Sequence, residues 1–151
     1  MDLSLIIPAY NEEESIPELV AWIKRVMANN NLQYDIWFVD DGSTDKTWKV
    51  LDQLHSEDPI HVKAIKFRRN YGKSAALNTA FHSCQGSVVI TMDADLQDSP
   101  EEIPALYQMI MKDRYDLVSG WKKKRFDPVF TKNLPSKLFN ATARKISGIN
   151  L

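Results

Sequence analysis

The chain has 151 residues, 44% of them hydrophobic, which is enough for one well-cored domain and too little for two ordinary ones. No apolar stretch approaches the roughly 20 residues of a membrane-spanning helix, and the N-terminus lacks the basic region of a signal peptide. A single cysteine, Cys84, excludes an internal disulfide and indicates a reducing compartment. These features predict a soluble, cytoplasmic globular domain.

The net charge of −1 conceals an asymmetry along the chain. Residues 1–120 carry 11 Lys and Arg against 19 Asp and Glu, whereas residues 121–151 carry 8 Lys and Arg and one acid, Asp127. A one-sided basic segment favours an anionic partner, which here means phosphate groups, a lipid surface or, less readily, nucleic acid. A solvated basic helix face is the alternative that the sequence leaves open.

The first half of the chain predicts two strands, each followed by a helix. Leu3 to Ile7 is a short apolar strand, and Ser15-x-x-Glu18 then forms a capping box at the start of a helix. Ile36 to Val39 is the second strand, and Thr44 to His55 is the second helix.

The same alternation continues through the second half. His61 to Phe67 predicts a third strand and Lys73 to Cys84 a helix. After a fourth strand, Val88 to Met92, the run Ser99-Pro100-Glu101-Glu102 is typical of a helix start. Asp116 to Ser119 predicts a fifth strand.

This alternation of strands and helices predicts the fold class. It implies right-handed crossovers and an α/β fold with a doubly wound, mostly parallel sheet and helices on both faces. Ligands bind such sheets beyond the carboxyl ends of the strands, near the point where strand order reverses. The loops that follow the strands are therefore the candidate site.

Asp93-Ala94-Asp95 follows the fourth strand and is the most informative of these loops. Residues two apart in an extended segment share a face, so both carboxylates should point the same way. Converging carboxylates repel unless a cation lies between them, and Mg²⁺ is usually held by one or two carboxylates together with substrate phosphates. The alternative is a turn that Asp95 caps.

The other loops lack a glycine cradle for phosphate. Residues 8–14 contain no glycine, which argues against a Rossmann dinucleotide site. Gly72-Lys73-Ser74 is similar to the end of a P-loop, but the first glycine of that motif is replaced by Phe67. Bound phosphates would need another counter-charge, and a metal on Asp93 and Asp95 would supply it.

An adjacent acidic pair, Asp40-Asp41, follows the second strand and precedes a Gly-Ser turn. A carboxylate at this position can accept the ring N–H of uracil or guanine. Two acids that cap the turn and the following helix are the alternative.

Three of these motifs together resemble glycosyltransferase family 2, which has a GT-A nucleotide-sugar-binding fold. They are Pro-Ala-Tyr-Asn-Glu-Glu at 8–13, Val-Asp-Asp-Gly-Ser-Thr-Asp at 39–45 and Met-Asp-Ala-Asp-Leu-Gln-Asp at 92–98. Residues 69–73 and 118–122 are similar to the polyprenyl-phosphate branch of the family, which includes dolichyl-phosphate mannose synthases. The resemblance covers roughly residues 3–150.

The resemblance implies a role for particular residues of this chain. The residues implied to line the base and ribose pocket are Pro8, Ala9, Tyr10 and Glu12, with Val39 and Asp41 on either side of the base. Asp93 and Asp95 are implied to be catalytic and to bind Mg²⁺ or Mn²⁺ and the diphosphate, with Gln97 as a further metal ligand or water holder and Ala94 beside the ribose. Lys122 falls where related synthases often carry an arginine against the donor phosphates, so a point charge replaces a bidentate fork there.

The implied function is inverting, metal-dependent transfer of a sugar from a UDP- or GDP-sugar to a polyprenyl phosphate. The full-length protein would then lie at the cytoplasmic face of a membrane, with no nucleic-acid partner and with its state as monomer or oligomer left open. Transfer to a cell-surface glycan or polysaccharide, or a non-catalytic nucleotide-sugar-binding module, are the alternatives.

Residues 1–120 would be the donor-binding α/β domain, and residues 121–151 the start of the acceptor- and membrane-facing part. A helix expected at Leu134 to Ile146 has a pattern compatible either with a membrane interface or with ordinary packing. Because family members usually continue beyond this point with an acceptor-side segment, we expect this chain alone to transfer sugar weakly or not at all.

Overall fold

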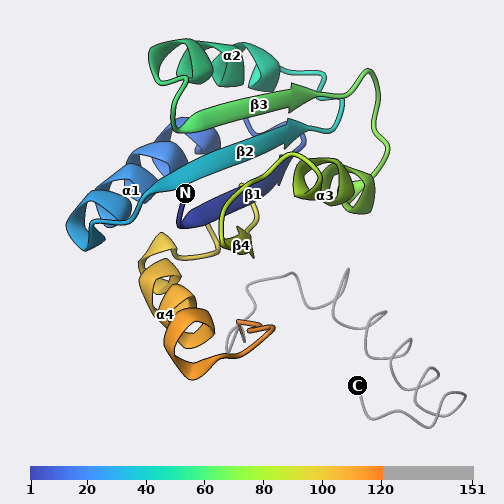
Figure 1. Cartoon of the computed structure of the whole chain (residues 1–151). Helices are drawn as coiled ribbons and strands as arrows, with labels where there is room; N and C mark the ends of the chain where they lie inside the picture. Colours follow the sequence, from blue (N-terminus) through green and yellow to red (C-terminus); the bar gives the residue numbers. More distant parts are fainter. Residues whose placement is uncertain (121–151) are drawn as a thin grey trace, which may run out of the picture. The chain divides into compact units, whose positions relative to one another are not determined.

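The computed structural model describes residues 1–120, and these form a parallel sheet covered by helices (Figure 1). The four strands are β1 (Leu3–Ala9), β2 (Tyr34–Asp40), β3 (Val62–Lys66) and β4 (Val88–Thr91). Their order is β3-β2-β1-β4, and every neighbouring pair is parallel. The chain therefore builds outward from β1 to β3 and then returns to the other side of β1, so that strand order reverses between β1 and β4.

Helices cover both faces of the sheet, as the sequence predicted. They are α1 (Ser15–Asn30), α2 (Thr47–Glu57), α3 (Lys73–Phe81), the short 3₁₀ turn η1 (Pro100–Glu102) and α4 (Ile103–Asp113). Leu5 and Ile7 of β1 share a buried cluster with α1, whereas Ile6 packs with Ala76 and Ala80 of α3. Successive side chains of a strand point to opposite faces of the sheet, so β1 contributes to both clusters. Because helices cover both faces, β1 is a nearly continuous apolar run.

The helix starts differ from the sequence prediction, and the N-cap residues of α1, α2 and η1 make no side-chain cap. Ser15 is already helical, and its hydroxyl donates to the Glu12 carboxylate at 2.8 Å, so the expected Ser15-x-x-Glu18 capping box is absent. Helix α2 begins three residues later than expected, at Thr47, whose N–H donates to Asp45 at 2.9 Å. Ser99 likewise makes no side-chain cap, and a 3₁₀ turn opens at Pro100 instead.

The expected fifth strand is wrong for this structure. Residues 116–119 are irregular, and the side chain of Leu117 is 85% exposed. A short segment with two apolar residues, such as Leu117 and Val118, becomes a strand only when it finds a sheet edge and a core to cover, and within residues 1–120 this segment finds neither. The described compact unit ends nearby, at Val118.

Residues 121–151, with Lys122 and the helix expected at Leu134 to Ile146, lie outside the described residues. The division of the chain into donor-binding and acceptor-facing parts stays a prediction. Of the helices in residues 1–120, none is long and apolar enough to cross a bilayer.

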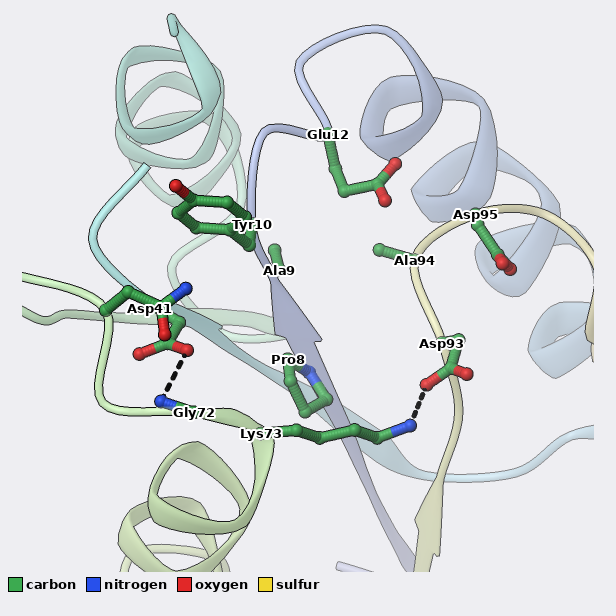
Figure 2. Close-up of a pocket in the computed structure, with 11 residues that line it drawn as sticks. Pro8, Ala9, Tyr10, Glu12, Asp41, Gly72, Lys73, Asp93, Ala94 and Asp95 are labelled. Carbon is green, nitrogen blue, oxygen red and sulfur yellow. Dashed lines mark hydrogen bonds and ion pairs between the residues drawn. The ribbon is translucent and has the colours of Figure 1, made fainter. Parts of the chain in front are cut away.

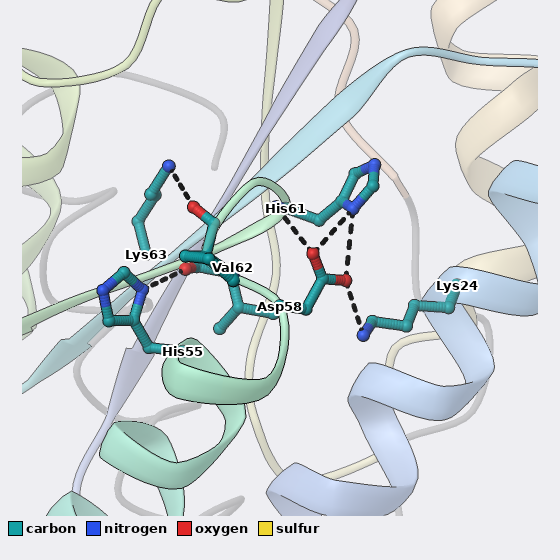
Figure 3. A network of polar contacts seen from close by, with 7 residues as sticks. Lys24, His55, Asp58, His61, Val62 and Lys63 are labelled. Carbon is teal, nitrogen blue, oxygen red and sulfur yellow. Dashed lines mark hydrogen bonds and ion pairs between the residues drawn. The ribbon is translucent and has the colours of Figure 1, made fainter.

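A polar junction lies at the amino ends of the strands, away from their carboxyl ends (Figure 3). Asp58, which follows α2, accepts hydrogen bonds from Lys24 of α1 at 2.7 Å and from the ring of His61 at 2.9 Å. The ring of His55 donates to the carbonyl of Val62 at 2.7 Å. These contacts link α1 and α2 to the start of β3.

Candidate active site

A pocket of about 350 Å³ opens at the carboxyl ends of the strands, where strand order reverses (Figure 2). Its walls come from the end of β1, the first residue of α3 and the loops that follow β1, β2, β3 and β4. The lining residues are Pro8, Ala9, Tyr10, Glu12, Asp41, Asn70, Gly72, Lys73, Asp93, Ala94 and Asp95. The fold therefore brings together segments that are as much as 87 positions apart in the sequence, from Pro8 to Asp95.

The loop after β1 is held in place by the loop after β2. Asn11 has a left-handed backbone with φ of 57° and receives a hydrogen bond on its side chain from the N–H of Thr44 at 2.9 Å. The N–H of Asn11 donates to Ser43 at 3.0 Å, and that of Glu12 donates to Thr47 at 2.8 Å. These bonds fix the backbone that follows Tyr10, a residue that is 46% exposed and lines the pocket.

The two acids of the loop after β2 have different surroundings. Asp41 lines the pocket, and its two oxygens accept the N–H groups of Tyr71 at 2.7 Å and Gly72 at 2.9 Å. Each carboxylate oxygen can accept more than one hydrogen bond, so Asp41 keeps acceptor capacity for a ligand. Asp41 thus joins the loop after β3 to the pocket wall.

Asp40, by contrast, is fully buried and does not line the pocket. One of its oxygens accepts the N–H of Ser43 at 2.9 Å, and the other has no hydrogen-bond partner in the described part of the chain. Asp40 therefore shapes the turn from inside. Both acids therefore make backbone contacts, as the capping alternative expected, and whether Asp41 also binds a base stays a prediction.

A close approach of two loops explains Gly42. Its φ is +74°, and a Cβ on it would lie 2.3 Å from the carbonyl carbon of Arg69. No side chain fits there, because the obstacle is backbone. The loop after β2 can therefore reach the loop after β3 only with glycine at position 42.

The loop after β4 carries Asp93, Ala94 and Asp95, all of which line the pocket. Asp95 accepts the N–H of Gln97 at 3.1 Å, which is the local turn that the sequence left as an alternative. The N–H of Asp93 donates to Asp98 at 3.0 Å. Asp95 therefore both shapes this loop and faces the cavity with free acceptor capacity.

The donor set at Asp93 and Asp95 fits a hard divalent cation. Within residues 1–120 no group of three His, Cys, Asp or Glu side chains converges as a metal cage. Two carboxylates beside an open cavity instead match Mg²⁺ or Mn²⁺, which are commonly held by one or two carboxylates with the remaining oxygens supplied by phosphate and water.

Lys73 is a pocket residue that the sequence reasoning missed as a functional group. It opens α3, and its ammonium group makes an ion pair with Asp93 across the pocket (Figure 2). Gly72-Lys73 was considered as the end of a P-loop, which the spacing excluded, and as part of the motif at residues 69–73, but Lys73 was given no role of its own. The position itself carried the information, because the helix after β3 begins at the same sheet edge as the other loops.

Three expected site residues are not part of the described pocket. Val39 is fully buried and packs with Ile6, Ala76 and Ala80 beneath the sheet edge. Gln97 does not line the cavity. Lys122 lies outside the described residues. The expected residues that the fold does bring together are Pro8, Ala9, Tyr10, Glu12, Asp41, Asp93, Ala94 and Asp95.

The parallel α/β sheet with an acidic pocket at its switch point has the architecture of the GT-A fold. The model of the family described as glycosyl transferase family 2 matches residues 4–150, and the chain belongs to this family. Both the fold class and the family expected from the motifs are thereby confirmed.

The similar proteins include polyprenyl-phosphate sugar transferases. Undecaprenyl-phosphate 4-deoxy-4-formamido-L-arabinose transferase of Pseudomonas fluorescens is 40% identical over 147 residues, which are 97% of this chain and 42% of that protein. Dodecaprenyl-phosphate galacturonate synthase of Rhizobium johnstonii is 32% identical over all of this chain and 45% of that protein. The chain therefore spans less than half the length of these relatives.

Two solved structures illustrate the fold. The mannosyltransferase PcManGT from Pyrobaculum calidifontis, in complex with GDP-Man and Mn²⁺, aligns with a TM-score of 0.63 and 25% identity over 72% of this chain and 32% of that chain. S. aureus TarS in complex with UDP-GlcNAc aligns with a TM-score of 0.61 and 23% identity over 87% of this chain and 38% of that chain. The second of these likenesses concerns the fold alone.

Proposed function

We propose that this chain binds the donor of an inverting, metal-dependent glycosyltransferase, which moves a sugar from a UDP- or GDP-sugar to a polyprenyl phosphate. One observation carries the proposal. The pocket at the switch point has an aromatic ring and a buried carboxylate on one side, Tyr10 and Asp41, and a pair of carboxylates on the other, Asp93 and Asp95. This arrangement offers separate surroundings for a base and for a diphosphate.

Tyr10 and Asp41 form the base side of the proposed site. A half-exposed ring on a fixed loop offers a flat apolar surface for stacking. Uracil and guanine each present a ring N–H, and Asp41 has acceptor capacity for one. Cytosine lacks such a donor, so the pair favours UDP- and GDP-linked donors over CDP-linked ones. Val39 would contribute from beneath this side through packing alone.

Asp93 and Asp95 form the diphosphate side. A divalent ion held by them supplies charge neutralisation for the departing nucleoside diphosphate. Ala94, between the two acids, is buried and small, and leaves room for a ribose. Gln97 and Lys122 remain candidates for a water contact at the metal and for a contact with the donor phosphates.

The proposed acceptor follows from the names of the similar proteins, which are transferases and synthases of polyprenyl phosphates. The second pKa of a phosphate monoester lies near 6, so such an acceptor is already an anionic nucleophile at neutral pH. The site then needs no strong general base, which agrees with a described pocket lined by no histidine.

The basic residues 121–151 would face the lipid, and the complete protein would act at the cytoplasmic side of a membrane. Anionic lipid attracts such a cluster through its surface potential. Liposome flotation of the chain with and without anionic lipid tests this part. We expect the chain to float with liposomes that contain anionic lipid and not with neutral ones. Equal flotation with both kinds of liposome would contradict this part of the proposal.

Calorimetric titration of the chain tests the donor assignment. UDP, GDP, CDP and the corresponding nucleotide sugars are titrated with and without Mn²⁺. We expect binding of UDP or GDP that requires Mn²⁺, weak or absent CDP binding, and little sugar transfer by this chain alone. Equal affinity with and without metal, or preferred binding of CDP, would reject the proposed donor site.

A further inference from the structure

Lys73 and Asp93 form an ion pair within the proposed donor site. The two residues are 20 positions apart, on α3 and on the loop after β4, and the ammonium group meets the Oδ1 atom of Asp93 (Figure 2). Their side chains are 57% and 40% exposed, so the contact is reachable from solvent. It occupies one oxygen of a carboxylate that is proposed to hold the metal.

The charges around the pocket make this pair unusual. Among its described lining residues the cavity has four carboxylates, those of Glu12, Asp41, Asp93 and Asp95, and a single cationic side chain, that of Lys73. A diphosphate entering such a pocket meets repulsion from every acid. Among the described lining residues, the cation available to offset that repulsion is Lys73, and a bound metal would add to it.

A lysine and a divalent ion that share the Asp93 carboxylate repel each other, so the ammonium group weakens metal binding there. The ion pair is also easy to break, since pairs exposed to solvent contribute little net stability. The base of the lysine is nevertheless fixed, because the N–H of Gly72 is bound by Asp41 at 2.9 Å. Only the flexible lysine stem needs to move.

We propose that Lys73 is an exchangeable counter-ion of Asp93. Without nucleotide its ammonium group neutralises Asp93 and weakens metal binding, and when metal and nucleotide enter together it turns to the diphosphate. Metal affinity thereby becomes dependent on the nucleotide. Both the diphosphate ligand and the metal at Asp93 rest on the proposed function, but the competition between Lys73 and the metal can be measured without nucleotide.

The test compares Lys73→Met with the unaltered chain. Free Mn²⁺ is measured by electron paramagnetic resonance, first with Mn²⁺ alone and then with UDP or GDP added. Removing the competing charge should tighten binding of Mn²⁺ alone by up to about fivefold. Losing a charge-assisted contact should weaken nucleotide binding in the presence of Mn²⁺ by about tenfold or more. Opposite changes in these two affinities are the expected signature.

Two further variants make the result specific. Lys49→Met removes the same charge from an exposed position on α2 outside the pocket and should change neither affinity. Lys73→Arg keeps the positive charge and should leave binding of Mn²⁺ alone as weak as in the unaltered chain. Circular dichroism and a thermal melt establish that each variant is folded before titration.

Three outcomes would overturn the inference: unchanged binding of Mn²⁺ alone in Lys73→Met, weaker binding of Mn²⁺ alone, or unchanged nucleotide affinity. Failure of the proposed function looks different, because the unaltered chain itself would then bind neither UDP nor GDP with Mn²⁺. In that case the arm with Mn²⁺ alone still decides whether Lys73 competes for Asp93.

Discussion

Asp41 accepts the backbone N–H of Gly72 at 2.9 Å, although the two residues are 31 positions apart. A second bond, from the N–H of Tyr71 at 2.7 Å, uses the other carboxylate oxygen. The acid proposed to meet the base therefore also fixes the start of α3, from which Lys73 reaches Asp93. Both halves of the pocket depend on this carboxylate.

Replacing Asp41 by Asn should impair both the fold and the site. An amide has one acceptor oxygen, so one of the two N–H groups would face an NH₂ group and lose its partner. We expect a loss of about 1–3 kcal/mol in unfolding free energy, measured by urea denaturation, and at least tenfold weaker UDP or GDP binding. Asp52→Asn on α2, which removes an exposed carboxylate outside the pocket, is the matched control. Equal behaviour of the two variants would contradict this role of Asp41.

Alanine at Gly42 should destabilise the chain more than alanine at Gly72. Both glycines have positive φ, +74° and +93°, but only the added Cβ at position 42 would meet neighbouring backbone, at 2.3 Å. Gly72→Ala should cost about 1–3 kcal/mol from backbone strain alone, and Gly42→Ala more than that. Urea denaturation of both variants provides the comparison. A smaller effect at position 42 would show that the loops after β2 and β3 are not in close contact.

Acid should weaken the junction around Asp58 (Figure 3). Burial raises the pKa of the Asp58 carboxyl, but hydrogen bonds from Lys24 and His61 together outweigh it and hold the pKa well below its ordinary value of 3.8. Because the folded-state pKa is the lower one, the stabilisation is present above the unfolded value and is lost as the pH falls below it toward the folded value.

Asp58→Asn should therefore cost roughly 1–2 kcal/mol near pH 7, a figure reduced for the partial exposure of Lys24 and His61. The variant should also lose less stability than the unaltered chain as the pH is lowered below about 4. Urea denaturation at several pH values measures both effects. Parallel curves for the two proteins at all pH values would argue against a depressed pKa at Asp58.

Hydrophobic periodicity located the strands and helices of residues 1–113 within a few residues, because each element has one or two buried faces. It failed at the helix starts, where backbone N–H groups find their hydrogen-bond acceptors in segments that are distant in the sequence. The N–H of Lys46, for example, donates to Glu13 at 2.9 Å, across 33 positions. It failed also at residues 116–119, where the composition suits a strand but the described fold offers no edge to pair with.

The candidate site was predictable where function required several acids or aromatics in one short motif. Tyr10, Asp41, Asp93 and Asp95 were identified in this way, and the fold brings them to one cavity. Lys73 was not identified, because it contacts Asp93 across 20 positions and neither local sequence segment indicates that contact. Val39 was assigned to the base side, yet it lies in the core beneath it.

Calorimetry of Asp95→Asn tests the central claim most directly, because this change removes one charge from the proposed metal site at the surface of a loop. The variant, Asp52→Asn and the unaltered chain are titrated with UDP and GDP in the presence of Mn²⁺. We predict that Mn²⁺-dependent binding is lost in Asp95→Asn alone, while its thermal melt stays close to that of the unaltered chain. Undiminished, Mn²⁺-dependent nucleotide binding by folded Asp95→Asn would contradict a metal–diphosphate site at Asp93 and Asp95.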